Sequence, residues 1–121
     1  MKEYVDIARR QPVTLILDEF YSSFIYESDG APGNGPVSGA TFIDDVDDDN
    51  ILLVDGLTKS FRYPGWRLGW IVGPEAMIEI INRAASSIDG GPSRPIQRAA
   101  IQVLEPYQAD TGTKALRTTF A

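Results

Sequence analysis

The stretch that decides the fold runs from residue 51 to residue 70 and reads ILLVDGLTKSFRYPGWRLGW. It opens with Ile51–Val54, a short apolar run that contains β-branched residues and ends at an aspartate. Such a run is typical of a strand that is buried on both faces, as in a parallel sheet covered by helices. Val13–Leu17 has the same character and also ends at an aspartate. We therefore expect these two runs to form adjacent parallel strands.

A third strand is expected at Leu68–Val72, where the quoted stretch ends. Only 13 residues separate it from the preceding strand, a short span for a helical crossover with its two loops, so we expect it to run antiparallel to the other two. Helical patterns are expected at Met1–Arg10, after Gly73-Pro74, from Ser93 to Pro106 and from Asp110 onward, with a glycine-rich loop at 28–39. The predicted fold is α/β: a three-layer α/β/α arrangement around a mostly parallel sheet with one antiparallel strand.

The composition excludes several classes of chemistry. The chain has 121 residues, no cysteine, no histidine and a formal charge of −6. Without cysteine or histidine there can be no disulfide framework, thiol nucleophile, Ser-His-Asp triad or histidine-based zinc site. The acidic balance argues against a nucleic-acid partner, which normally meets a basic face. Acid–base chemistry is left to lysine, tyrosine and carboxylate side chains.

Neither a membrane nor a metal is indicated as a partner. No stretch approaches the roughly 18 apolar residues that a membrane span needs. Residues 1–12 are too charged for a signal-peptide core, so we expect a cytoplasmic protein. Asp44–Asn50 holds five aspartates. It matches a calcium loop poorly, because Asn50 stands at the glycine position and Gly56 at the glutamate position. A solvated loop is the favoured interpretation.

Lys59 is the residue of the quoted stretch that can carry chemistry. A phosphate-binding P-loop would need glycines one and six residues before it, where Thr58 and Leu53 stand. A lysine at the end of a buried strand is expected to be partly desolvated, which frees its amine as a nucleophile. Amine nucleophiles form Schiff bases, and the commonest biological partner is an aldehyde cofactor such as pyridoxal 5′-phosphate. That cofactor also needs a carboxylate at its ring nitrogen, a phenol at its ring hydroxyl and a cation at its phosphate. The residues available for these roles are, in that order, Asp18, Tyr21 and Arg67.

Three linked motifs resemble those of a known family. They are Asp18-Glu19-Phe20-Tyr21, Thr58-Lys59 and Pro64-Gly65-Trp66-Arg67-Leu68-Gly69. Their spacing is similar to that of the class I/II aminotransferases of fold type I. In that family an Asp-x-x-Tyr follows one sheet strand, a Ser/Thr-Lys follows the next, and an arginine lies eight residues beyond the lysine, as it does here. The resemblance runs from Val13 to the helix after Pro92 and so covers nearly the whole chain.

The resemblance implies a role for each of these residues. Lys59 would form the Schiff base with pyridoxal 5′-phosphate and would shuttle the proton between the substrate Cα and the cofactor C4′. Asp18 would pair with the pyridinium, Tyr21 would donate to the ring oxygen, and Arg67 would bind the phosphate.

One position departs from the family pattern. The family often carries a serine three residues before the lysine as a further phosphate ligand, and this chain has Gly56 there. Thr58, beside the lysine, could partly replace that contact. Taken singly, each candidate also has an ordinary alternative. These alternatives are a helix cap for Asp18, a core aromatic for Tyr21, a surface lysine for Lys59 and an ion-pair partner for Arg67.

The function that the resemblance implies is amino-group transfer between an amino acid and a 2-oxo acid, by a homodimer. Two alternatives stay open. One is a lyase or decarboxylase of the same fold type, since the cofactor stabilises the same carbanion for several outcomes. The other is a non-catalytic effector-binding domain of an aminotransferase-like transcription regulator. On this resemblance the 121 residues would be the second half of the large domain, without the small domain. Alone they would neither transaminate nor hold the cofactor tightly.

Overall fold

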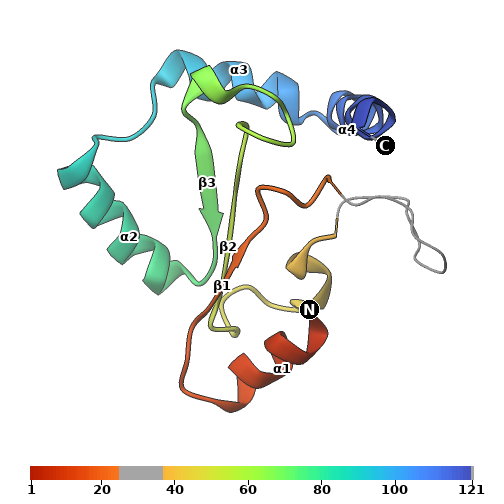
Figure 1. Ribbon diagram of the computed structural model, residues 1–121. Helices are drawn as coiled ribbons and strands as arrows, with labels where there is room; N and C mark the ends of the chain where they lie inside the picture. Colours follow the sequence, from red (N-terminus) through yellow and green to blue (C-terminus); the bar gives the residue numbers. More distant parts are fainter. Residues whose placement is uncertain (25–36, 121) are drawn as a thin grey trace. The chain divides into compact units, whose positions relative to one another are not determined.

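The computed structural model describes residues 1–24 and 37–120, which form an α/β chain (Figure 1). The helices are α1 (Lys2–Arg10), α2 (Glu75–Ile88), α3 (Arg94–Leu104) and α4 (Pro106–Phe120), with short 3₁₀ helices η1 (Gly39–Phe42) and η2 (Pro64–Trp66). The strands are β1 (Leu15–Asp18), β2 (Ile51–Gly56) and β3 (Gly69–Val72). Most of the glycine-rich loop expected at 28–39 lies outside the described residues.

The chain divides into two compact units. The first comprises Met1–Glu19, Ser38–Asp55 and Trp70–Gly91, and the second comprises Phe20–Val37, Gly56–Gly69 and Pro92–Ala121. The first unit therefore contains most of the sheet together with α1 and α2. The second contains the loop that joins β2 to β3, together with α3 and α4.

The sheet has the strand order β1-β2-β3. β1 and β2 are parallel, with Leu15 opposite Ile51 and Asp18 opposite Val54, as the two apolar runs predict. β3 runs antiparallel to β2, because Gly73, directly after β3, lies against the start of β2. A Cβ placed on Gly73 would come 3.0 Å from the carbonyl oxygen of Ile51. The predicted direction of β3 is therefore confirmed.

One face of the sheet forms the core of the first unit. Val5 of α1 and Ile51 of β2 are 0% and 1% exposed, and Leu53 joins them. The partly buried residues packed around this cluster are Leu15, Leu17, Phe42 and Ile43. Ile16, which alternates with Leu15 and Leu17 and so points to the opposite face, is 62% exposed. The first unit thus shows an α/β arrangement, and the predicted three layers stay a prediction.

The acidic loop before β2 is not simply solvated, so that expectation is wrong for part of it. Asp49 is 5% exposed and accepts hydrogen bonds from Nε (2.6 Å) and Nη2 (2.7 Å) of Arg9 in α1. Asp47 Oδ1 accepts from the backbone N–H of Glu75 (2.8 Å), one of the free donors at the start of α2. These carboxylates fasten two helices to the loop. Within the described ranges, no group of three or more carboxylates is placed to hold a metal ion.

Several element boundaries differ from the expected ones, and for β1 and α4 the cause is clear. β1 begins at Leu15 and not at Val13, because Val13 N donates to Gln11 O (2.8 Å) in a turn that precedes the strand. α4 begins at Pro106 and not at Asp110. The fixed φ and missing N–H of proline suit the first position of a helix, so Pro106 opens α4 as well as following α3. Among the described residues, no helix combines the length and the apolar character that crossing a bilayer requires.

Candidate functional site

The loop from Gly56 to Gly69 carries most of the predicted site residues. A backbone hydrogen bond from Leu57 N to Leu68 O (3.0 Å) closes its two ends. Both side chains are buried, Leu57 completely, so the hydrophobic effect fixes the same two points. Tyr63 N donates to Leu57 O (2.9 Å), which folds the middle of the loop back on its start. The residues just after Leu57 are therefore brought beside those just before Leu68.

Three of the predicted cofactor-binding residues line one pocket in this unit. Thr58 and Lys59 come from the start of the loop and Arg67 from its end. The pocket has a volume of about 320 Å³, and its remaining walls are Phe20, Leu68 and Gly69. A hydroxyl, a primary amine and a guanidinium thus border the same hollow, as their spacing in the sequence predicts.

Tyr21 lies beside the amine of this pocket. Lys59 Nζ is 5.3 Å from the centroid of the Tyr21 ring, a cation–π distance. The tyrosine of the first motif and the lysine of the second are therefore neighbours in space. Lys59 is itself exposed, so the expectation that the end of the strand desolvates its amine is wrong for this chain. The pocket walls that the described residues supply leave the lysine open to water.

Arg67 has an unusual backbone conformation. Its φ is 50° and its ψ 44°, in the left-handed region, which costs a non-glycine residue about 1–2 kcal/mol. Its Nη1 donates to Pro64 O (3.2 Å), which folds the guanidinium over η2. The rings of Tyr63 and Trp66 stack with centroids 4.4 Å apart and brace the same turn. Strain of this kind persists only where the surrounding packing enforces it, and it is concentrated at functional sites in proteins.

Asp18 belongs to the first unit, whereas the other candidates belong to the second. It is the last residue of β1 and lies opposite Val54 of β2. The next residue, Glu19, donates its N–H to Val54 O (2.8 Å), so the parallel pairing continues one step beyond Asp18. Asp18 is exposed. Its assignment to the cofactor ring nitrogen stays a prediction.

Phe20 is a pocket wall that the sequence motifs do not indicate as a site residue, and its ring helps to explain why residue 56 is a glycine. A Cβ on Gly56 would lie 2.8 Å from Leu68 O and 2.9 Å from both Gly69 Cα and Phe20 Cε1. Ser60 is 3% exposed, and its hydroxyl donates to Phe20 O (3.4 Å), which ties this residue to the loop. The ring of Phe20 and the backbone of β3 fill the space that the serine side chain of the family would need. The glycine itself was the available signal, since a Gly at that position indicates close packing.

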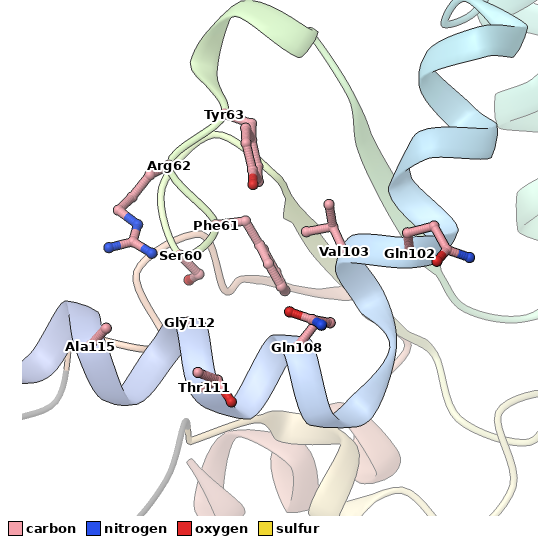
Figure 2. Close-up of a pocket in the computed structure, with 10 residues that line it drawn as sticks. All are labelled: Ser60, Phe61, Arg62, Tyr63, Gln102, Val103, Gln108, Thr111, Gly112 and Ala115. Carbon is pink, nitrogen blue, oxygen red and sulfur yellow. The ribbon is translucent and has the colours of Figure 1, made fainter.

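A second hollow, of about 430 Å³, is lined in part by the residues that directly follow Lys59. Its walls come from Ser60–Tyr63 and from α3 and α4. Figure 2 shows Phe61 pointing from the loop between Val103 of α3 and Gln108 of α4. The loop therefore lies against both helices of the second unit, and this support fixes the backbone from which Lys59 projects.

The comparisons with known proteins all find aminotransferases. A family model described as aminotransferase class I and II matches residues 1–120. The "Putative aminotransferase AatC" of Rhizobium meliloti is 32% identical over 109 residues, which are 90% of this chain and 25% of that protein. The "Glutamate-pyruvate aminotransferase AlaC" of Escherichia coli is 32% identical over 107 residues, 88% of this chain and 24% of that protein. This chain thus spans about a quarter of the length of the curated relatives it matches.

Solved structures show the same likeness. An aromatic aminotransferase from Pyrococcus horikoshii superimposes with a TM-score of 0.79 at 26% identity, over 97% of this chain and 30% of that one. A double mutant of Thermus thermophilus aspartate aminotransferase gives a TM-score of 0.78 at 22% identity, over 97% of this chain and 28% of that one. The second likeness concerns the fold alone.

Proposed function

The chain belongs to the aminotransferase class I and II family, and from that membership we propose that its protein uses pyridoxal 5′-phosphate to move an amino group between an amino acid and a 2-oxo acid. The observation that carries the proposal is the shared pocket of Thr58, Lys59 and Arg67, with the Tyr21 ring beside the lysine amine. Each of these four side chains has a non-functional explanation when taken singly, but all four lie close together in the second unit. Their functional groups are the ones that this cofactor requires.

The donor set of the pocket fits the cofactor. The primary amine of Lys59 is the group that condenses with an aldehyde, and the planar guanidinium of Arg67 matches the geometry of a phosphate. Thr58 adds a hydroxyl for the phosphate, and Tyr21 adds a phenol for the ring oxygen. Asp18 would hold the ring nitrogen protonated from the end of β1. When bound, the cofactor supplies the electron sink that makes the substrate α-carbon acidic.

In this assignment Lys59 is the residue that transfers the proton. Its Nζ would hold the cofactor through its primary amine and would accept and return the proton of the substrate α-carbon. Tyr21 keeps the amine beside its own ring and so limits where Nζ can move. Arg67 and Thr58 anchor one end of the pocket, so that the reacting groups are held in place.

We assign residues 1–121 to the second half of a cofactor-binding large domain with three α/β/α layers. The exposed Ile16 supports this assignment, because an apolar sheet face needs a covering layer. The exposure of Lys59 supports a site completed by further polypeptide, including a second subunit of a homodimer. Effective catalysis at such a lysine requires that water be excluded.

The test is a transamination assay on the full-length protein of the reading frame that contains this chain. Aspartate, glutamate with pyruvate, and LL-diaminopimelate are the first substrates to try, because relatives carry these names. Lys59→Ala should abolish turnover, since it removes both the nucleophile and the proton carrier. Lys114→Ala is the matched control: that amine pairs with Asp110 on α4 (2.6 Å), and the variant should keep full activity.

The other outcomes of this assay decide between the alternatives. Turnover that releases product without forming the new amino acid from the 2-oxo acid would identify a lyase or decarboxylase. Tight effector binding with no turnover of any amino acid would favour the regulatory domain. Full activity in Lys59→Ala would overturn the assignment of the site.

A further inference from the structure

A row of aromatic rings in the second unit ends at the amine of Lys59. The ring centroids of Tyr21 and Phe24 are 5.6 Å apart, and those of Phe24 and Phe120 are 6.1 Å apart, both pairs inclined by 56°. At the other end of the row, Lys59 Nζ lies 5.3 Å from the Tyr21 centroid. The row therefore connects the last residue of α4 to the proposed Schiff-base lysine.

Phe24 is the most firmly held ring of the three. Tyr21 and Phe120 are 59% and 60% exposed, whereas Phe24 is partly buried. Phe24 N donates to Tyr21 O (3.0 Å), so a backbone turn also fixes the separation of these two residues. Tilted rings place the positive edge of one against the negative face of the other, which gives the contact a preferred orientation.

We propose that Phe24 is a positioning residue, whose ring holds Tyr21 in the orientation that meets Lys59 Nζ, with Phe120 supporting it from α4. The inference rests on the proposed function and extends it to a residue that acts through Tyr21. An exposed tyrosine side chain is free to change rotamer, and a ring contact on its far side restricts that freedom. The phenol and the amine are thereby kept ready for the cofactor before it binds.

The experiment compares variants of the full-length holoprotein by two readouts other than turnover. One is the dissociation constant of pyridoxal 5′-phosphate, and the other is the circular dichroism of the visible band of the lysine-bound cofactor, which reports its orientation. Phe24→Leu keeps apolar volume and loses the ring. It should weaken binding by about three- to tenfold, the range that one tilted aromatic contact supplies, and should reduce the dichroic band. Phe24→Tyr keeps the ring and should stay within about twofold of the wild type.

Three further comparisons separate positioning from packing. Tyr107→Leu removes a ring that is 79% exposed on α4 and should leave both readouts unchanged. If Phe24→Leu lowers the yield of folded protein, Phe120→Leu perturbs the same row from its exposed end and should shift both readouts in the same direction. In a Tyr21→Ala background, Phe24→Leu should cause no further loss, because the residue that it positions is gone.

The outcomes that overturn the inference are specific. An unchanged dichroic band in Phe24→Leu, or an equal loss in the wild-type and Tyr21→Ala backgrounds, would show that Phe24 is packing only, while the proposed function stands. A wild-type protein with no visible band from Lys59 would overturn the proposed function itself, and this inference with it.

Discussion

Restoring the family serine at position 56 should harm this protein. By sequence pattern alone, Gly56→Ser would add a phosphate ligand three residues before Lys59 and tighten the cofactor. In the structure, a Cβ at this position meets Leu68 O at 2.8 Å and both Gly69 Cα and Phe20 Cε1 at 2.9 Å. Two of these three atoms are backbone, so they cannot move aside as the end of a flexible side chain can.

The size of the effect follows from this overlap. Overpacking a closely packed site typically costs about 1–3 kcal/mol of folding free energy. About 2 kcal/mol corresponds to a fall in melting temperature of about 4–8 °C for a domain of 150–250 residues. Phe20 also forms a wall of the cofactor pocket, so displacing its ring should weaken cofactor binding and not strengthen it.

Gly65→Ser in the same loop is the matched control. A Cβ at Gly65 has no atom within 4 Å, so this variant should melt close to the wild type. Thermal unfolding of the two apoproteins and titration with pyridoxal 5′-phosphate measure both effects. The proposed packing of Phe20 and β3 around position 56 would be refuted by two results together. Gly56→Ser would have the same melting temperature as Gly65→Ser, and it would bind the cofactor more tightly than the wild type.

Two further predictions concern charged groups. The Arg9 hydrogen bond holds the pKa of the Asp49 carboxyl below its usual range, so this contribution to stability is present above the unfolded-state pKa and is lost as the pH falls through the lower folded value. Asp49→Asn should therefore be less stable than the wild type at neutral pH, and the difference in stability should shrink below about pH 4. Acid unfolding followed by circular dichroism measures this difference, and a difference that stays constant with pH would contradict the prediction. Arg67→Lys keeps the charge but loses the planar fork, so cofactor affinity should fall about tenfold, the worth of one charge-assisted hydrogen bond. Unchanged affinity in an absorbance titration would remove Arg67 from the phosphate site.

The sheet was predictable because its signal is local. The run Ile51–Val54 and the run before Asp18 are apolar on both faces, and this pattern alone indicates neighbouring buried strands. The short connection to Leu68–Val72 then leaves room only for an antiparallel return. The clustering of Lys59 with Arg67 was predictable from motif spacing, since the loop between two adjacent strands must bring its ends together.

The remaining features depend on contacts between residues far apart in the sequence. The glycine at position 56 indicates close packing but not that the ring of Phe20 fills the space, and nothing near Asp49 indicates that Arg9 pairs with it. The exposure of Lys59 was also unpredictable, because a strand pattern says where a strand ends and not how much chain covers that end. The sequence pattern predicts that Pro106 ends one helix, and in the structure it also begins the next, two roles that one proline can serve.

The most direct test of the central claim is to reduce the full-length holoprotein with borohydride and map the modified peptide by mass spectrometry. The chain contains three lysines, and they lie in different settings. Lys2 is in α1 of the first unit, Lys114 pairs with Asp110 on α4, and Lys59 lines the pocket with Thr58 and Arg67. The account predicts that, of these three, only Lys59 carries the pyridoxyl group. A pyridoxyl group on Lys2 or Lys114, with Lys59 unmodified, would contradict it.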